Sequence, residues 1–293
     1  MSIAAAEPAA QASGMGTLFV VATPIGNLED ISARALRVLA EVDLIAAEDT
    51  RHTRKLLRHF GISTPLRSYH AHNAKSRHEI LLDALVEGDV ALVSDAGTPG
   101  ISDPGQELVD AVLRAGFPVS PVPGPSALIA AVSISGLVAG PFLTLGFLPR
   151  KGPERRRTLG RAQLAGVSLI IFEAPSRLVA TLRDLASIFG ERKALVAREL
   201  TKLHEEVRRD SLAGLASYFE RDAVRGECVV VIGPAAESEL RTADDPRSLV
   251  TRLVKQGMKP SEIARETAAI TGLPRDELYA LAREVGQENC SKG

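Results

Sequence analysis

Short apolar runs alternate with longer amphipathic segments along most of the chain. The runs at 17–22, 43–47, 90–93 and 119–122 are each followed by a turn rich in Gly, Pro or acidic residues, which is typical of buried strands. Between them, segments such as 30–42 place apolar residues every three or four positions, which predicts amphipathic helices. Strands that alternate with helices at this spacing predict an α/β fold with a largely parallel sheet.

The same alternation resumes after the break at Pro123-Gly124-Pro125, with apolar runs that predict strands near 142–148, 168–172, 193–198 and 228–232. We place the domain boundary just after this break. The chain is thus expected to comprise a disordered Ala/Pro-rich tail, an N-terminal α/β domain, a C-terminal α/β domain, and a linker with a helical hairpin, at residues 1–15, 16–125, 126–236 and 237–293.

The terminal hairpin has a recognisable pattern. Predicted helices at 260–269 and 276–285 flank the turn Thr271-Gly272-Leu273-Pro274, in which Gly272 can adopt the left-handed conformation that ends a helix. This arrangement resembles a helix-turn-helix, although generic helical hairpins share it.

Composition limits the partners and the compartment. The apolar fraction of 45% and charged fraction of 24% are those of an ordinary globular protein, and the net charge of −1 provides no overall basic field. Cys228 and Cys290 are too few for a disulfide framework and suit a reducing cytosol, so we expect a cytoplasmic protein. The uncharged span between Arg114 and Arg150 is broken by prolines, which favours buried elements over a membrane segment.

The segment Ala91–Gly105, which reads ALVSDAGTPGISDPG, is the leading candidate for a ligand-binding loop. It leaves the predicted strand 90–93 with Asp95 at its mouth, and its glycines permit close approach of a ligand to the backbone. Asp103 is expected to cap the next helix, with Pro104 in the first helical position. Open α/β sheets bind ligands at such a place, although ordinary strand–helix turns look similar.

Acidic residues recur directly after predicted strands. They are Asp49, Asp95, Glu173 and Glu199. Each can simply cap a helix or pair with a nearby arginine, but four at equivalent positions favour a reactive edge of the sheet.

Basic residues gather in two predicted helices that also follow strands. The first cluster is Arg51, His52, Arg54, Lys55 and Arg58, and the second is Arg150, Lys151, Arg155, Arg156, Arg157 and Arg161. Solvated helix faces can explain both clusters, but their position at the same edge as the acids suggests a rim that grips phosphate groups.

Several familiar sites are absent from the sequence. It contains no G-x-G-x-x-G after the first strand, no P-loop and no G-x-S-x-G elbow. His70 and His72, with His78 and Asp49, were the best available metal ligands, but no further ligand stands at a diagnostic spacing. We therefore expect no metal.

Seven motifs occur in order at the predicted strand ends. They are VATPIGNLEDIS, LIAAEDTRHT, ALVSDAGTPGISDPG, PVPGPSALIAA, GFLPRKG, FEAPSR and ARELTK. Over residues 16–234 the sequence resembles the bacterial ribosomal RNA small subunit methyltransferase I family, within the tetrapyrrole methylase-like (class III) S-adenosylmethionine (SAM) methyltransferases. The terminal hairpin resembles that family's helix-turn-helix extension. FEAPSR stands where the family more commonly has Tyr-Glu-Ser-Pro-His-Arg.

The resemblance implies a two-domain α/β fold of the tetrapyrrole methylase type, with a SAM cleft between the domains and a small C-terminal helical extension. It implies 2′-O-ribose methylation of a decoding-centre cytidine in 16S ribosomal RNA by a homodimer that needs no metal. The SAM-binding residues that it implies are Pro24, Ser94, Asp95, Ala96, Gly97, Thr98, Ser126, Ala127, Gly146, Phe147 and Gly233. The candidate RNA-binding residues are Arg51, His52, Arg54, Arg150, Lys151, Arg155, Arg156 and Arg157.

Methyl transfer to a ribose hydroxyl requires close positioning of oxygen and methyl group and removal of the hydroxyl proton. The candidate bases are Lys202, if neighbouring arginines depress its pKa, and Glu173, and the sequence does not rank them. Two other functions stay open at this point. One is methylation of a tetrapyrrole or other small molecule by the same fold, against which the basic clusters argue. The other is a non-enzymatic helix-turn-helix regulator with an α/β ligand-sensing body.

Overall fold

The computed structural model describes residues 15–70, 74–235 and 246–290, and the chain divides into two compact units, 1–127 and 128–293. All but the last residue of the tail expected at 1–15 lies outside the described residues. The three terminal helices belong to the second unit.

The first unit is built on a parallel sheet of five strands in the order β3-β2-β4-β1-β5, which confirms the parallel arrangement that the sequence predicts. The strands are β1 (Leu18–Val21), β2 (Leu44–Ala47), β3 (Leu66–Ser68), β4 (Val90–Val93) and β5 (Val119–Val122). All four residues of the central strand β4 are buried, because helices cover both faces of the sheet.

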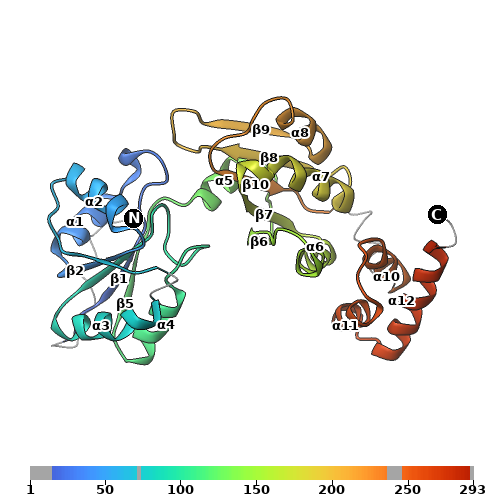
Figure 1. Ribbon diagram of the computed structural model, residues 1–293, viewed down its shortest axis with the longest axis horizontal. Coiled ribbons are helices and arrows are strands. Elements are labelled where there is room, and N and C mark those ends of the chain that lie inside the picture. Colours follow the sequence, from blue (N-terminus) through green and yellow to red (C-terminus); the bar gives the residue numbers. More distant parts are fainter. Residues whose placement is uncertain (1–14, 71–73, 236–245, 291–293) are drawn as a thin grey trace, which may run out of the picture. The chain divides into compact units, whose positions relative to one another are not determined.

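The helices of the first unit form two layers (Figure 1). They are η1 (Leu28–Asp30), α1 (Ala33–Glu41), α2 (Thr50–His59), α3 (Ala74–Glu87) and α4 (Gln106–Arg114). Leu39 of α1 and Leu57 of α2 pack in one apolar core, and Leu85 of α3 and Leu108 of α4 pack in the other. The carboxyl ends of the strands are thereby held at one edge of the sheet.

The second unit contains a mixed sheet in the order β6-β7-β10-β8-β9. Its strands are β6 (Phe142–Phe147), β7 (Ser168–Glu173), β8 (Lys193–Arg198), β9 (Glu206–Ser211) and β10 (Cys228–Ile232). Only the β6–β7 pairing is parallel, so the alternation of strands and helices predicts these elements but not their directions. The edge strand β9 is missed from the sequence because its residues, EVRRDS, are mostly charged and exposed.

Five helical segments accompany this sheet. They are α5 (Ala127–Ser135), α6 (Pro153–Ala165), η2 (Pro175–Arg177), α7 (Leu178–Phe189) and α8 (Leu212–Phe219). Apolar side chains of α6, α7 and α8 join those of the strands in one core, which includes Leu159, Leu182 and Leu215.

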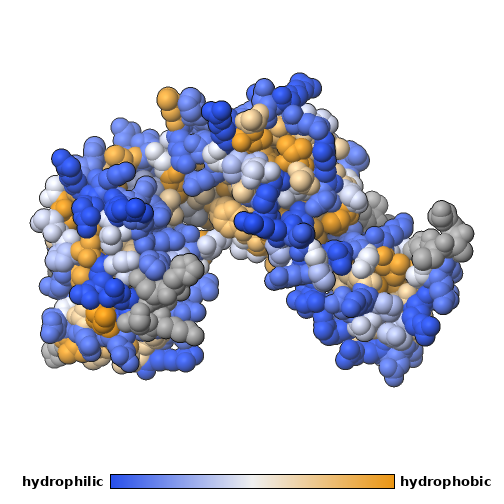
Figure 2. All heavy atoms as spheres, viewed as in Figure 1, coloured by the Kyte–Doolittle hydropathy of each residue, from blue (hydrophilic) through white to orange (hydrophobic). Residues whose placement is uncertain are grey.

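The chain ends in three helices, α10 (Pro246–Lys255), α11 (Pro260–Thr271) and α12 (Arg275–Cys290). The predicted hairpin corresponds to α11 and α12, and Gly272 ends α11 with a φ of +70°. Helix α10 is unforeseen, because we interpreted its beginning as linker. The three helices share a small core of their own, and their visible face is mostly hydrophilic (Figure 2).

Among the helices within the described ranges, none combines the length and the apolar character that crossing a bilayer demands.

Candidate active site

In the first unit, the loop after β4 is tied to the turn after β1. The Thr23 N–H donates to the Gly97 carbonyl over 2.9 Å, and the Gly97 N–H donates back to the Thr23 carbonyl over 3.0 Å. The Thr23 hydroxyl also donates to the Ser94 carbonyl. Gly97 is buried with a φ of +80°, a conformation that other residues rarely adopt. Two turns that the sequence predicts separately therefore form one rigid backbone surface, which includes Pro24 and residues 94–98.

Three carboxylates lie together at the same edge of this sheet. The Asp49 N–H donates to Asp95 Oδ1 over 3.0 Å, and the Asp95 N–H donates to Glu48 Oε2 over 3.3 Å. Burial raises the pKa of Glu48 above its usual value, and the charge of Asp95 adds to the rise. Hydrogen bonds from Arg51 hold the pKa of Asp49 far below its usual range. Asp49 is already paired with Arg51, so Glu48 and Asp95 are the groups of this cluster that a cationic ligand would neutralise.

Sequence reasoning placed Asp49 and Asp95 at this edge but missed Glu48. Glu48 could have been found by the same rule as Asp49 and Asp95, because it directly follows a strand, β2, and β2 pairs with β4.

The start of α4 differs from the prediction of an Asp103 cap with Pro104 at the first helical position. The helix begins at Gln106, and its N-cap is Gly105 with a φ of +148° and no side-chain cap. A Cβ atom on Gly105 would lie 3.1 Å from Leu92 Cδ2, so the chain passes too close to β4 for a larger residue. The Gln106 side chain donates to the Gly100 carbonyl and stabilises the loop instead of the helix end.

The residues considered as metal ligands are not gathered. The His78 Nε2 atom lies 3.1 Å from the Tyr69 hydroxyl, and His72 is outside the described residues. Within the described ranges, no three metal-binding side chains are grouped.

In the second unit, the implied SAM-binding residues lie on β6 and near β10. Gly146 has a φ of +58° where the register of β6 and β7 shifts, and this irregularity precedes Phe147. The Phe147 ring is 58% exposed and 5.7 Å from the ring of Phe172, so it offers a flat apolar surface. The Gly233 N–H donates to the Lys193 carbonyl over 2.8 Å.

Ser126 and Ala127 complete the implied set. They are half-buried at the beginning of α5, where Ala127 is the first helical residue.

Glu173 is enclosed by protein atoms. Its side chain has no exposed surface, and its Oε1 atom accepts from the Ala174 N–H and pairs with Arg177. Its Oε2 atom accepts from the Thr181 hydroxyl over 2.6 Å and from Arg177 over 3.2 Å. This geometry anchors the start of α7 and leaves no oxygen facing a substrate.

Lys202 is surrounded by acids. Its role as a base would require neighbouring arginines that lower its pKa. Its Nζ lies 2.9 Å from Glu199 Oε1 and 3.0 Å from Glu227 Oε2. Burial lowers the pKa of Lys202, but the hydrogen bonds to the two glutamates outweigh it and leave the pKa above its usual value. The condition that we set for a basic Lys202 is therefore not met, and the group is a cation at neutral pH.

The loop that carries Lys202 is strained. Glu199 and Thr201 have φ values of +51° and +66°, which are uncommon for residues with a side chain. The Lys202–Glu199 ion pair and the hydrogen bond from the Glu227 N–H to Glu199 hold this conformation.

The two basic clusters have different surroundings. In α2, Arg51 is bonded to Asp49, the N-cap of its own helix, while His52 and Arg54 are exposed. In α6, Arg155 is only 8% exposed and pairs with Asp184 over 2.8 Å.

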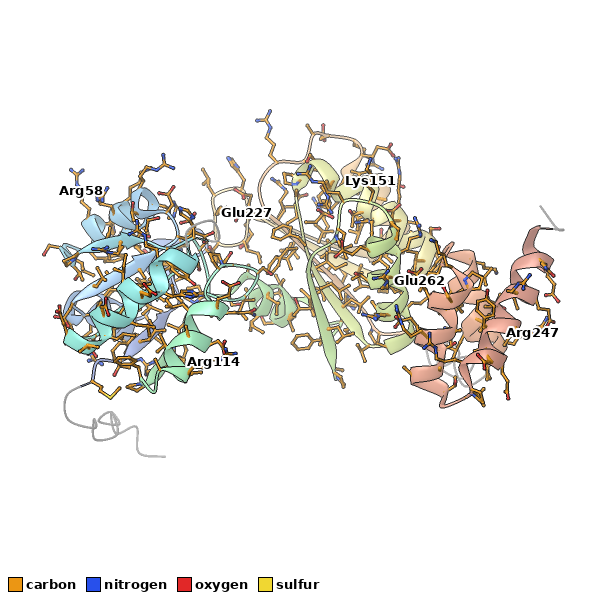
Figure 3. The ribbon with its side chains drawn as sticks, turned by 60° about the horizontal axis from the view of Figure 1, so that its bottom comes forward. Arg58, Arg114, Lys151, Glu227, Arg247 and Glu262 are labelled. Atoms are coloured by element: carbon orange, nitrogen blue, oxygen red, sulfur yellow. The ribbon has the colours of Figure 1, made fainter. Side chains whose placement is uncertain are left out.

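Two further arginines of α6 pair with α11. Arg157 contacts Glu262 and Arg161 contacts Glu266, each over 2.8 Å, and Glu262 lies where α6 meets the terminal helices (Figure 3). Arg150, Lys151 and Arg156 are exposed and line a cavity of about 720 Å³.

Comparison with known proteins gives two family matches. Residues 17–216 match the family described as tetrapyrrole (corrin/porphyrin) methylases, and residues 242–284 match the family described as the RsmI C-terminal HTH domain. The protein named ribosomal RNA small subunit methyltransferase I from Synechocystis is 48% identical over 92% of this chain and 99% of its own length. The protein of the same name from Pseudomonas aeruginosa is also 48% identical, over 91% of this chain and 96% of its own.

Solved structures share the fold at lower identity. Uroporphyrin-III C-methyltransferase from Thermus thermophilus, complexed with S-adenosyl homocysteine, is 22% identical with a TM-score of 0.52, over 77% of this chain and 99% of its own. A diphthine synthase is 16% identical with a TM-score of 0.58, over 77% of this chain and 94% of its own.

Proposed function

Because this chain belongs to the ribosomal RNA small subunit methyltransferase I family of the tetrapyrrole methylases, we propose that it methylates the ribose 2′-oxygen of a cytidine in 16S ribosomal RNA, with SAM as methyl donor. The observation that carries this proposal is similarity at 48% identity along nearly the full length of proteins with that name. The solved uroporphyrin-III C-methyltransferase is only 22% identical and shares the fold alone, so a small-molecule substrate is the weaker alternative.

The residues of the first unit suit the donor. SAM supplies an electrophilic methyl group on a sulfonium and also carries a positively charged amino group. The carboxylates of Glu48 and Asp95 match this charge, and the rigid loop 94–98 presents peptide groups beside them. We propose that SAM is contacted by Pro24, Ser94, Asp95, Ala96, Gly97, Thr98, Ser126, Ala127, Gly146, Phe147 and Gly233.

The environment of the two candidate bases supports other roles for them. Glu173 positions α7 through Thr181 and Arg177. Lys202 is protonated, so it can bind an anionic group of the RNA but cannot accept the hydroxyl proton. We propose that catalysis depends mainly on positioning of the two reactants, which can supply roughly 7–11 kcal/mol.

We further propose a homodimer that acts on the small ribosomal subunit in the cytoplasm. Apolar side chains on α5 and on the edge strand β6 support a subunit contact. Ile129, Ile134, Phe142 and Leu143 are 55%, 49%, 39% and 40% exposed, respectively. A free sheet edge beside such residues is normally covered.

The test is methyl transfer by the purified chain, with labelled SAM and three acceptors: small ribosomal subunits, free 16S RNA and a uroporphyrinogen. We expect label in RNA, at a ribose of cytidine. Asp95→Ala and Gly97→Val should abolish SAM binding in calorimetry, whereas Asp110→Ala, an exposed change on α4, should not. Label in the tetrapyrrole and none in RNA would refute the proposed substrate.

A further inference from the structure

A basic cavity in the second unit is shared by the α/β core and the terminal helices. It has a volume of about 720 Å³ and is lined by residues of α6, α7 and α10. Six basic residues contribute to its wall: Arg150, Lys151, Arg155, Arg156, Arg252 and Lys255. Asp184, the one carboxylate among the described residues of the wall, is already paired with Arg155. The cavity is therefore strongly positive.

The terminal helices are held beside α6 by specific contacts. Arg161 forms a two-pronged contact with Glu266, through Nε and Nη2 at 2.8 Å each. Gln256 donates to Gln163 Oε1 over 2.5 Å. At Gly160 of α6, a Cβ atom would lie 3.1 Å from Met258 Sδ and 3.2 Å from Leu253 Cδ2, so a glycine allows this close packing.

These contacts place the acidic residues of the terminal helices against α6 and the basic residues of α10 on the cavity wall. The acids Glu262 and Glu266 of α11 are neutralised by α6, whereas Arg252 and Lys255 of α10 face the cavity. The amino end of α6 also faces it, with Gly152 as an N-cap that makes no side-chain hydrogen bond, and its dipole adds positive potential. Helix α10 therefore supplies one wall of the cavity.

We propose that this cavity binds the phosphate backbone of an RNA strand, and that α10 is an RNA-binding element of this protein. The proposal rests on the proposed function and assigns its substrate a second contact. A wall of several separated cations suits successive phosphates of a strand better than one small anion. Among the described residues of its wall none is aromatic, so the cavity offers no surface on which bases stack, and its cations supply affinity.

The experiment compares two double variants of the full-length chain. Arg252→Glu with Lys255→Glu changes the cavity, and Arg275→Glu with Arg283→Glu makes the same charge change on exposed residues of α12. We would measure SAM affinity by calorimetry, thermal unfolding, and binding to the small ribosomal subunit and its 16S RNA at several salt concentrations.

We expect the cavity variant to bind RNA at least about tenfold more weakly than the α12 variant. The slope of log K against log salt should fall by about 1.4 for two lost phosphate contacts, while SAM affinity is unchanged. If the charge reversals disturb folding, Arg252→Gln with Lys255→Gln should still weaken RNA binding, by a smaller factor.

The outcomes separate the two proposals. Equal RNA binding by the cavity and α12 variants, with methyl transfer intact in the unaltered chain, would overturn the cavity and leave the function standing. An unaltered chain that binds SAM but neither binds nor methylates RNA would overturn both.

Discussion

Helices α2 and α6 contain similar runs of basic residues, yet the fold uses them in different ways. Arg54 of α2 is exposed, and Arg51 forms its ion pair with Asp49, the N-cap of its own helix. In α6, Arg155 is buried against Asp184, and Arg157 and Arg161 pair with α11. From the sequence both clusters were interpreted as parts of one phosphate-binding rim.

The difference comes from what packs against each helix. Among the described residues, no ion pair joins α2 to an acid of another element, although the charge of Asp95 acts on Arg51. By contrast, α6 lies between α7 and α11, which both present carboxylates that pair with its arginines. A basic helix therefore indicates a nucleic-acid surface only where its charges are left over after folding. In and just before α6 these are Arg156 and, in the preceding loop, Arg150 and Lys151.

The largest contrast should come from truncating one arginine in each helix. Arg155→Ala removes hydrogen bonds to Asp184, Thr181 and the Pro149 carbonyl, and we expect a loss of about 2–3 kcal/mol in the free energy of unfolding. Arg54→Ala should change it by less than about 0.5 kcal/mol. Urea titration of both variants measures this. Equal stability of the two would show that burial does not distinguish the helices.

Substitution of Gly160 tests the packing of α6 against the terminal helices. Gly160→Leu should lower the free energy of unfolding by about 1–3 kcal/mol, because Met258 and Leu253 leave no room for the side chain. Gly160→Ala should be close to neutral, since the neighbours are flexible side chains and alanine favours the helix by up to about 1 kcal/mol. Amide exchange in α10 and α11 reports the docking. Unchanged protection in the leucine variant would contradict the close contact.

A charge reversal in α2 sharpens the comparison from the other side. Arg54→Glu should leave thermal unfolding unchanged and weaken RNA binding severalfold, with the salt slope lower by about 0.7–0.9 for one lost phosphate contact. The matched control is Arg114→Glu, because Arg114 is 79% exposed on α4 and outside both basic clusters. A loss of RNA affinity as large in the control would remove α2 from the RNA-binding surface.

The smallest effect concerns pH. Hydrogen bonds from Arg157 and Arg161 lower the pKa of Glu262 and Glu266, respectively. Their contribution to docking is therefore complete above the unfolded pKa of about 4.5 and is lost as the pH falls through the lowered values. Amide exchange in α11 should speed up in this acidic range.

Glu262→Gln with Glu266→Gln should remove that pH dependence, whereas Glu284→Gln, which affects the pair with Arg247 inside the terminal helices, should retain it. If the double variant keeps the full acid response, other groups control the docking.

Much of the fold follows from local patterns. The sequence predicts β4, β8 and β10 with the bounds that the structure has, because each is a continuous apolar segment. Strand β9 and helix α10 escape prediction, because one is exposed and charged and the other follows a polar segment.

The candidate site also has features that the sequence predicts and features that it does not. That Asp49 and Asp95 meet at one edge follows from parallel strands, whose ends share a side of the sheet. The charged state of Lys202 cannot be predicted from local sequence, since it depends on a hydrogen bond to Glu227, which is 25 residues away.

The apolar strands, the parallel first sheet and, through seven ordered motifs, the family and its chemistry can be read from the residues in order, because each is recorded in neighbouring positions. Which charges remain available on the surface depends on how distant segments pack together. Arg157 and Glu262 are 105 residues apart, and a pairing over that distance leaves no local pattern to read. For this reason the folded chain, and not its list of basic residues, determines where an RNA strand can be held.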